Sequence, residues 1–357
     1  MFGHDYTVGI EEELLLVDPV SGSLAPLAAS VLASVALPRS RVDHELFAAE
    51  LEVRSEPCER VEEAIADIAD GRGEVSRAGG TVIGSGLHPA AALGDAQLTD
   101  DPRYEHVTRL VGGLTSRTPE AALQVHVGLP DREVAVRVLN GLRELLPVFI
   151  GLAANSPWHL GKPTAMSSFR YAIVRPYPTR CAPPHCDSYF DYSARVEEII
   201  RYGALPDYTY VYWDVRLQPR LGTVEIREMD AQADLVTIAG IAAFAQSVCI
   251  ALGTGRMALA PSSSEALSWS CFRAARDGLE ATIYHQGHEI PLRALVGALV
   301  DELMPVARQR KSGSTLNGLR STLEVGGGAA FQRRLGEEGG AEMLVASLID
   351  ATRKGSY

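Results

Sequence analysis

Three consecutive glutamates interrupt an apolar stretch near the start of the chain. The stretch reads Thr7-Val-Gly-Ile-Glu-Glu-Glu-Leu-Leu-Leu-Val-Asp18, and its apolar residues predict a buried strand. Because side chains alternate between the faces of a strand, Glu11 and Glu13 share one face while Glu12 shares the apolar face or its rim. Neighbouring carboxylates repel each other and lose hydration, and a bound cation removes that cost. The alternative is a solvated edge strand whose glutamates face water.

A second acidic patch lies between residues 43 and 54. Leu51 and Val53 alternate there with glutamates and an arginine, which predicts a strand with one polar face. Glu45 precedes Glu52 by seven residues, a spacing of the wrong parity for one regular strand. A bend or bulge must therefore separate the two residues if their carboxylates converge.

Three further segments repeat this pattern of apolar residues on one strand face and polar residues on the other. Residues 123–129, 213–217 and 223–229 present three polar pairs, namely Gln124 with His126, Asp214 with Arg216, and Glu225 with Arg227. The simplest assembly of all five segments is an α+β fold. In it a curved, mostly antiparallel sheet packs its convex face on helices and lines its concave face with oxygen and nitrogen ligands.

Such a concave face would bind metal and anions together. Glutamates select hard cations such as Mg²⁺ or Mn²⁺, and arginines on the same surface select phosphate or carboxylate. This combination suits the chemistry of a magnesium nucleotide. The sequence contains neither a Gly-x-x-x-x-Gly-Lys loop nor a Gly-x-Gly-x-x-Gly fingerprint after a strand, so neither of those nucleotide-binding folds is predicted.

The elements that position these strands are helices and one long loop region. Helical spacing or composition predicts helices over 24–37, 60–79 and 131–154, and helices with glycine-rich joints after about residue 231. Residues 155–189 form a loop region rich in Pro, Ser and Arg, and loops of that length are usually functional or disordered. No linker divides the chain. We expect one domain over 1–357, with a sheet-rich core over about 5–230 and a helical part over about 231–357.

Composition restricts the partners. The chain has 357 residues, is 46% hydrophobic and carries a formal net charge of -12, so neither a nucleic acid nor an anionic membrane is an expected partner. The N-terminal residues lack a signal-peptide pattern, and a cytoplasmic location is the expectation. Five scattered cysteines argue against a disulfide framework. Small-molecule substrates are the expected partners, and a homo-oligomer is compatible with the sequence.

Two local patterns have an alternative interpretation. Residues 235–253 carry no formal charge and approach the length of a membrane span, but polar and small residues inside the segment favour a helix buried behind the sheet. Cys181, His185 and Cys186 could suggest zinc. Three clustered ligands without a second cluster are a weak signal, however, and a proline-stiffened loop is the preferred interpretation.

The ordered motifs resemble one known family, the carboxylate-amine ligases identified as type 2 glutamate-cysteine ligases. The resemblance spans about residues 5–250 and rests on Gly9-Ile-Glu-Glu-Glu-Leu14, Val17-Asp18, Glu45-Leu-Phe-Ala-Ala-Glu-Leu-Glu52, His88-Pro89, Arg103-Tyr104, Val125-His-Val-Gly128, Ala154-Asn-Ser-Pro157 and Thr223-Val-Glu-Ile-Arg227. This family is similar to the glutamine synthetase superfamily, whose catalytic domain is an antiparallel sheet funnel backed by helices. The resemblance implies ATP-dependent amide formation between a carboxylate, typically the γ-carboxylate of glutamate, and an amine such as cysteine.

The resemblance also implies roles for individual residues. The implied metal ligands are Glu11, Glu13, Glu45, Glu52, Gln124 and Glu225, and the implied contacts to the nucleotide phosphates are His126, Arg216 and Arg227. One departure is Gln124, which stands where superfamily members commonly have histidine, although plant-type glutamate-cysteine ligases resemble this chain there. From its place in the long loop, Arg170 is predicted to contact a substrate carboxylate or a phosphate, and a surface arginine is the alternative.

The expected reaction proceeds through an acyl phosphate, because a carboxylate is a poor electrophile until it is phosphorylated. Two alternatives stay open at this point. A guanidino kinase-like phosphotransferase resembles the same sheet funnel, and a catalytically silent metabolite-binding protein could retain it.

Overall fold

An open antiparallel sheet forms the centre of the computed structural model, which describes residues 2–92 and 94–357. The strand order is β2-β3-β1-β5-β9-β8, and β4 pairs with β1 beside this path. All of these pairings are antiparallel. The strands of the sheet are β1 Val8–Leu16, β2 Val42–His44, β3 Glu50–Arg54, β4 Val82–Ile83, β5 Ala122–Gly128, β8 Val215–Gln218 and β9 Thr223–Asp230.

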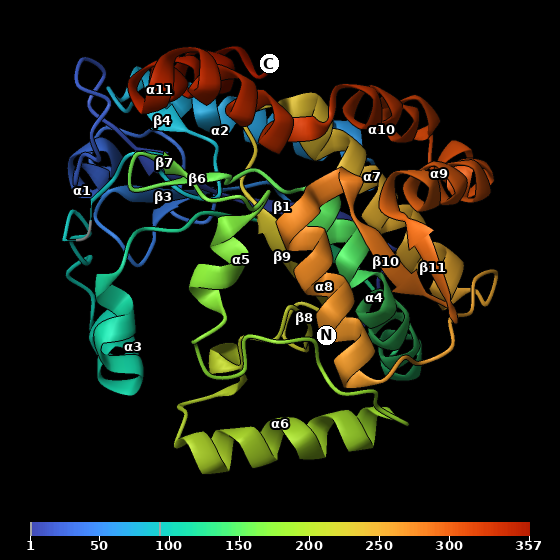
Figure 1. Cartoon of the computed structure of the whole chain (residues 1–357). Coiled ribbons are helices and arrows are strands. Elements are labelled where there is room, and N and C mark those ends of the chain that lie inside the picture. The colour runs from blue at the N-terminus through green and yellow to red at the C-terminus, as the bar shows by residue number, and fades with distance from the viewer. Residues whose placement is uncertain (1, 93) are drawn as a thin grey trace.

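Helices and two small hairpins surround this sheet (Figure 1). The hairpins are β6 Trp158–His159 with β7 Lys162–Pro163, and β10 Thr282–His285 with β11 His288–Pro291. The α-helices are α1 Ala28–Leu32, α2 Val61–Arg77, α3 Pro102–Val111, α4 Arg132–Leu152, α5 Phe169–Val174, α6 Tyr189–Gly203, α7 Leu235–Gly253, α8 Ser264–Asp277, α9 Leu292–Gln309, α10 Gly313–Val325 and α11 Gly327–Lys354. The short 3₁₀ helices are η1 Gly112–Ser116, η2 Tyr208–Tyr210 and η3 Gly278–Glu280.

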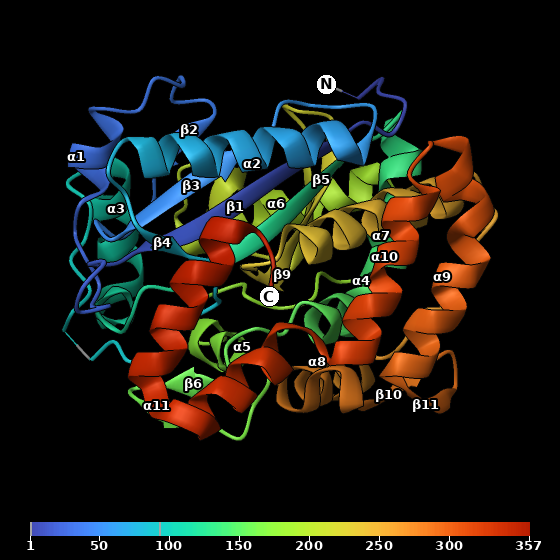
Figure 2. The ribbon, with the colours of Figure 1, turned by 90° about the horizontal axis from the view of Figure 1, so that it is seen from above.

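One face of the sheet is buried under helices. Figure 2 shows α2 lying across β1 and β3, and α7 and α4 pack against β5 and β9. Val8, Ile10 and Leu14 of β1 point into this core and are at most 1% exposed. Glu12 shares their face, as its parity predicts, and its buried carboxylate is paired with the guanidinium of Arg72 from α2. A buried charge is tolerated there because it is paired and hydrogen-bonded.

The register of the strands aligns the polar side chains on the opposite face. Glu13 lies directly across from Glu52, and Glu11 lies across from Gln124. His126 and Arg216 both lie across from Glu225. The predicted gathering of polar side chains on one sheet face, opposite the helices, is therefore found.

A register shift between β5 and β9 changes the direction of the side chains at one end of the polar face. The pairing skips between Leu123 and Val125, so β9 has an extra residue there. A bulge of this kind turns successive side chains to the same side of a strand. Arg227 lies at the wall of the polar cavity, while Glu228 makes ion pairs with arginines of the 155–189 segment. The bulge thus divides the polar face into two parts. The open part includes Arg227 and lines the cavity, and the covered part includes Glu228 and lies under the 155–189 segment.

Several predicted elements differ in extent from the structure. The helix expected over 24–37 is only the five residues of α1, because Leu24 pairs with Val17 and residues 25–27 are irregular before it, while a turn follows it at residues 33–34. The loop region 155–189 contains α5 and a small hairpin. The prediction that only helices follow residue 231 is wrong, since β10 and β11 form a hairpin there. The division into a core of about 5–230 and a helical part stays a prediction.

Helix α7 is the apolar segment that could be mistaken for a membrane span. It is long and apolar enough to cross a membrane, with a mean hydropathy of 2.1, yet 83% of that window is buried inside the protein. Phe244 of α7 meets Phe149 of α4 edge to face in the core. The prediction of a buried helix behind the sheet is confirmed.

Candidate active site

The polar face of the sheet opens into a cavity of about 450 Å³. Side chains from β1, β3, β5, β8 and β9 line its floor, and residues of α3 and of the segments around 177–180 and 209–212 line its walls. Nine of the ten predicted site residues line this one cavity, namely Glu11, Glu13, Glu45, Glu52, Gln124, His126, Arg216, Glu225 and Arg227. Their assigned roles stay predictions.

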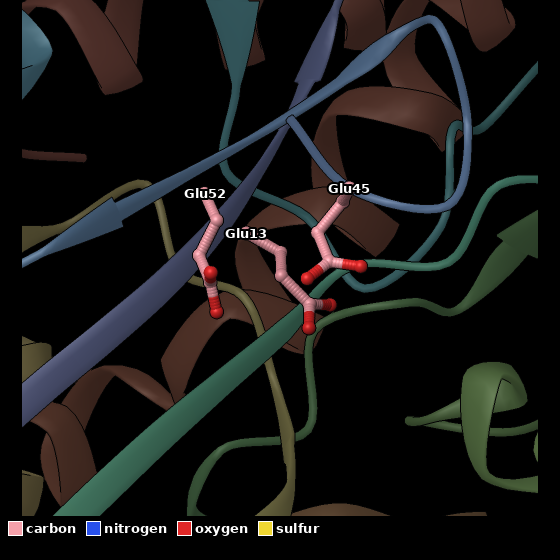
Figure 3. Close-up of side chains that lie close together, drawn as sticks. All are labelled: Glu13, Glu45 and Glu52. Atoms are coloured by element: carbon pink, nitrogen blue, oxygen red, sulfur yellow. The ribbon is translucent and has the colours of Figure 1, made fainter. Parts of the chain in front are cut away.

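Three carboxylates converge at the β1–β3 end of the cavity. Oxygen atoms of Glu13, Glu45 and Glu52 all lie within 4.8 Å of one another, and among the described residues this is the group placed to hold a metal ion. Glu13 and Glu52 extend from paired strands, while Glu45 extends from the loop after β2 (Figure 3). The loop resolves the parity problem of the seven-residue spacing, because the chain reverses between the two glutamates.

The surroundings of Glu13 and Glu45 disfavour the ionised form of their own carboxyl groups. Burial, together with the charges of Glu45 and Glu120, raises the pKa of Glu13 to about 8. Burial also raises the pKa of Glu45, against the hydrogen bond that its carboxylate accepts from the backbone N–H of Leu46. Three close carboxylates with these neighbours fit a hard divalent cation, which replaces their repulsion with attraction.

The β8–β9 end has the opposite character. Glu225 accepts hydrogen bonds from Arg216 Nε at 2.8 Å and from Gln218 Nε2 at 2.8 Å, and it also pairs with Arg227. Arg227 donates in turn to Gln124 Oε1 at 2.7 Å, and Gln124 Nε2 donates to Glu13 Oε1 at 2.9 Å. Glu225 and Gln124 are thus engaged by donors within the protein, and they would have to exchange those partners to bind a metal.

Glu11 lies between the two ends beside His126. The Nε2 atom of His126 is 3.3 Å from Glu11 Oε1, and its Nδ1 atom is 3.0 Å from the hydroxyl of Thr223. Although burial opposes it, the neighbouring His126, Arg54 and Arg227 lower the pKa of Glu11 to about 2. Glu11 is therefore held as a carboxylate in surroundings of positive charge.

Sequence reasoning did not assign three further residues of the cavity. Glu50 begins β3 and lies two residues before Glu52 on the same face, a parity that could have identified it. Glu120 and Arg180 lie in irregular segments, where no periodicity signals them. They contact each other, with Arg180 Nη2 3.4 Å from Glu120 Oε1.

Arg170 is the predicted site residue that the structure places outside the cavity lining. It is 0% exposed, so the alternative of a surface arginine is wrong, while its contact with a substrate stays a prediction. Its Nε lies 2.5 Å from Glu120 Oε2, and its Nη1 lies 4.0 Å from Asp230. The covered part of the sheet face explains this burial, because α5 packs Arg170 behind the wall that Glu120 forms.

The arginines of the 155–189 segment share a buried acidic network. Arg175 contacts Asp214 at 3.0 Å and Glu228 at 2.6 Å, while Arg180 Nη1 is 3.8 Å from Glu228. This network anchors the segment to the sheet. In the same segment Cys181 is exposed and Cys186 is buried. Cys181, His185 and Cys186 lie in the irregular segment between α5 and α6, as the interpretation as a loop predicts.

The sheet, its helical backing and a cavity that combines acidic and arginine-rich ends define the class of carboxylate-amine ligases. Comparison with known proteins agrees. The sequence model of glutamate-cysteine ligase family 2 matches residues 7–347. The chain belongs to this family, and the recognition made from its motifs is confirmed.

Relatives and solved structures support the same assignment. The chain is 35% identical, over 97% of both chains, to a Rubrobacter xylanophilus protein whose name assigns it to glutamate-cysteine ligase 2, and 33% identical to one from Rhodococcus jostii, over 93% of this chain and 92% of the relative. Its fold is similar to glutamate-cysteine ligase of Francisella tularensis in complex with AMP, with a TM-score of 0.72 and 13% identity over 100% of this chain and 90% of that one. A bifunctional glutathione synthetase of Pasteurella multocida gives a TM-score of 0.70 and 13% identity over 98% of this chain and 52% of that one.

Proposed function

We propose that this ligase uses ATP to join the γ-carboxylate of glutamate to an amine, with cysteine or another small amine as acceptor, through an acyl phosphate. The observation that carries the proposal is the division of one cavity into a carboxylate trio and an arginine-rich end. Phosphoryl transfer needs both, because the phosphate oxygens carry charge that cations must stabilise. The family to which the chain belongs supports the same reaction.

The residues divide the work according to their positions. Glu13, Glu45 and Glu52 would hold one divalent ion, Mg²⁺ or Mn²⁺, which when bound neutralises charge on the phosphates. Arg216, Arg227 and His126 bind and orient the phosphates at the other end. Glu11, Gln124 and Glu225 are the further metal ligands implied by the sequence. In this role they would exchange their present partners for the ion, with Arg216 and Arg227 released toward phosphate.

The proposed mechanism requires no nucleophilic side chain. The donor carboxylate attacks the γ-phosphorus of ATP, and ADP leaves. The uncharged amine then attacks the acyl carbon, phosphate leaves, and the proton that the nitrogen loses passes to the phosphate or to water. The cavity fits this scheme because it offers metal ligands and cationic side chains. Burial raises the pKa of Cys186 to about 11, and burial likewise raises the pKa of the core thiols of Cys249 and Cys271. These thiols stay protonated and are poor nucleophiles.

The test is turnover with ATP, Mg²⁺ and glutamate across a panel of amino acids and amines. We expect ADP, phosphate and an amide to form in equal amounts. With oxygen-18 in the donor carboxylate, one labelled oxygen should appear in the released phosphate. Label that stays out of the phosphate would overturn the acyl phosphate. Transfer of phosphate to a guanidino acceptor without free phosphate would instead indicate a phosphotransferase, and absence of turnover with every amine would indicate a silent binding protein.

A further inference from the structure

The outer face of α6 carries the two most exposed aromatic side chains of the described residues. Phe190 is 82% exposed and Tyr202 is 79% exposed. Figure 1 shows α6 along the lower side of the molecule, below β8 and α5. Large aromatic side chains are enriched in protein interfaces, where association removes them from water. The outer face of α6 is therefore a surface on which a partner would be stabilised.

The inner face of α6 holds the helix firmly against the sheet. Tyr192 and Val196 are buried in the core. The hydroxyl of Tyr192 accepts a hydrogen bond from the backbone N–H of Leu217 at 3.1 Å and donates one to the carbonyl oxygen of the same residue at 3.4 Å. Leu217 belongs to β8, which lies at the edge of the sheet. Because α6 is fixed in this way, its outer face is a preorganised surface, which lowers the cost of association.

Two rows of side chains run along the outer face. Each row has the spacing i, i+4, i+7, i+11, which keeps its members on one side of a helix. One row consists of Asp191, Arg195, Glu198 and Tyr202, and the other consists of Phe190, Ala194, Glu197 and Arg201. The intervals 4, 3, 4 are the same when counted from either end of the helix. A two-fold axis through the middle of α6 would therefore place each row against its own copy in reverse order.

This two-fold relation would bring complementary side chains together. In the first row, Arg195 would face Glu198 of the second copy, which is a pair of opposite charges. In the second row, Phe190 would face Arg201 of the second copy, whose guanidinium can stack on the aromatic ring. Ala194, near the middle, is small enough for the two helices to approach closely. The outer face of α6 is thus complementary to itself.

The charged groups of this face are available to a partner. Arg195 contacts Asp191 through its Nε atom at 3.0 Å. Glu198 forms no ion pair with any of the described residues, and neither does Arg201, whose Cζ atom lies 5.7 Å from the ring centroid of the adjacent Tyr202. No contact within the described chain has to be broken to form the pairs.

We propose that α6 is the contact surface of a symmetric homodimer, in which its outer face packs antiparallel against the same face of a second copy of this chain. The inference does not depend on the proposed function. A standard interface buries about 800 Å² of each partner. One helix of 15 residues offers less than that. We therefore expect a dissociable dimer, with a dissociation constant on the order of micromolar.

Sedimentation velocity of the purified chain, at concentrations from below to well above the micromolar range, tests the dimer. We expect a shift from monomer to dimer as the concentration rises. Phe190→Ala and Tyr202→Ala should each weaken dimerisation about tenfold or more, because each substitution removes two interface aromatics from the dimer. The matched control is Trp269→Ala on α8, an aromatic side chain that is 65% exposed, which should leave dimerisation within twofold. A wild type that stays monomeric throughout would overturn the inference.

An exchange of charges tests whether the partner is a second copy in the antiparallel arrangement. Arg195→Glu and Glu198→Arg each place like charges opposite one another twice, so each variant alone should dimerise about tenfold more weakly or worse. An equimolar mixture of the two variants regains both unlike pairs, and we expect it to form a heterodimer with nearly wild-type affinity. The matched control is Arg109→Glu on α3, whose exposed side chain pairs with Glu105. Its mixture with Glu198→Arg should gain nothing.

The remaining outcomes also decide the inference. If both charge variants keep the wild-type unfolding temperature but their mixture does not associate, the antiparallel arrangement is overturned. A dimer that none of the α6 substitutions weakens would show that the copies meet through another surface, which likewise overturns it. Should Arg195→Glu lose stability with its contact to Asp191, the weaker dimers of Phe190→Ala and Tyr202→Ala test the same surface without that contact.

Discussion

The two ends of the cavity contain the same residue type in opposite surroundings. At the β1–β3 end, Glu13, Glu45 and Glu52 face one another, and burial raises the pKa of Glu13 to about 8. At the β8–β9 end, Glu225 is held by arginines and by Gln218. At the first end Glu52 is paired with Arg54, but Glu13 faces the like charges of Glu45 and Glu120, whereas at the second end Glu225 is already paired with arginines. A carboxylate therefore becomes a metal-ligand candidate through its neighbours rather than through its own chemistry.

The largest effect should come from removing a member of the trio. Glu52→Gln should lower turnover by roughly a hundredfold or more and weaken Mn²⁺ binding, because a ligand oxygen loses its charge. Phosphate release, Mn²⁺ titration and thermal unfolding would measure this. Glu105→Gln is the control for loss of charge alone. Wild-type turnover in Glu52→Gln would show that the carboxylate of Glu52 is not a ligand of a metal ion that the reaction needs.

Arg170→Met tests the covered part of the sheet face. It removes a buried cation between Glu120 and Asp230 and leaves their charges without it, so we expect a loss of about 3–5 kcal/mol in the free energy of unfolding. Denaturant unfolding measures this loss. Replacement of exposed Arg109 by Met should change stability by less than about 0.5 kcal/mol. A stable Arg170→Met protein with altered Michaelis constants alone would support the prediction that Arg170 contacts substrate.

The two kinds of environment predict opposite dependences of stability on pH. A carboxyl whose folded pKa is raised, as for Glu13, binds more protons in the folded state, so stability falls as pH rises from about 4.5 to about 8. Glu11 and Glu228, whose pKa values are lowered to about 2, contribute stability that is present above about 4.5 and lost as pH falls toward 2.

Thermal unfolding between pH 5 and 8, with and without Mg²⁺, measures the first dependence. Without the ion, we expect the melting temperature to fall as pH rises, and Glu13→Gln should flatten the profile. Saturating Mg²⁺ should also flatten it, because the ion favours the charged form. A melting temperature that rises with pH in the absence of metal would show that ionisation of the trio does not destabilise the folded protein.

The smallest effect is expected at the rim of the trio. The hydroxyl of Tyr104 donates to Glu45 Oε2 at 3.4 Å, which is long for a hydrogen bond. Tyr104→Phe should therefore change the free energy of unfolding by less than about 1 kcal/mol and Mn²⁺ affinity by only a few-fold. Isothermal titration with Mn²⁺ measures the affinity. A loss as large as that of Glu52→Gln would place Tyr104 among the groups that hold the ion.

Strand alternation was the informative signal in this sequence. It predicted which side chains share the polar face, because period-2 geometry is a local property of the backbone. Amphipathic spacing likewise predicted α2 and α4. The same rule extended to Glu50 would have added it to the site. The burial of Arg170 was not predicted, because α5 has only six residues and is too short to show a clear helical periodicity in the sequence.

The sequence by itself determined the residue types of the site, the antiparallel class of the sheet, the helical backing and the family. Only the tertiary structure decided which carboxylates meet each other and which meet arginines. That choice depends on the hairpin that returns Glu45 to Glu52, on the bulge beside Arg227, and on the 155–189 segment that covers Glu228. These contacts join residues far apart in the chain, and their energies depend on distance and burial. Local sequence patterns carry neither quantity.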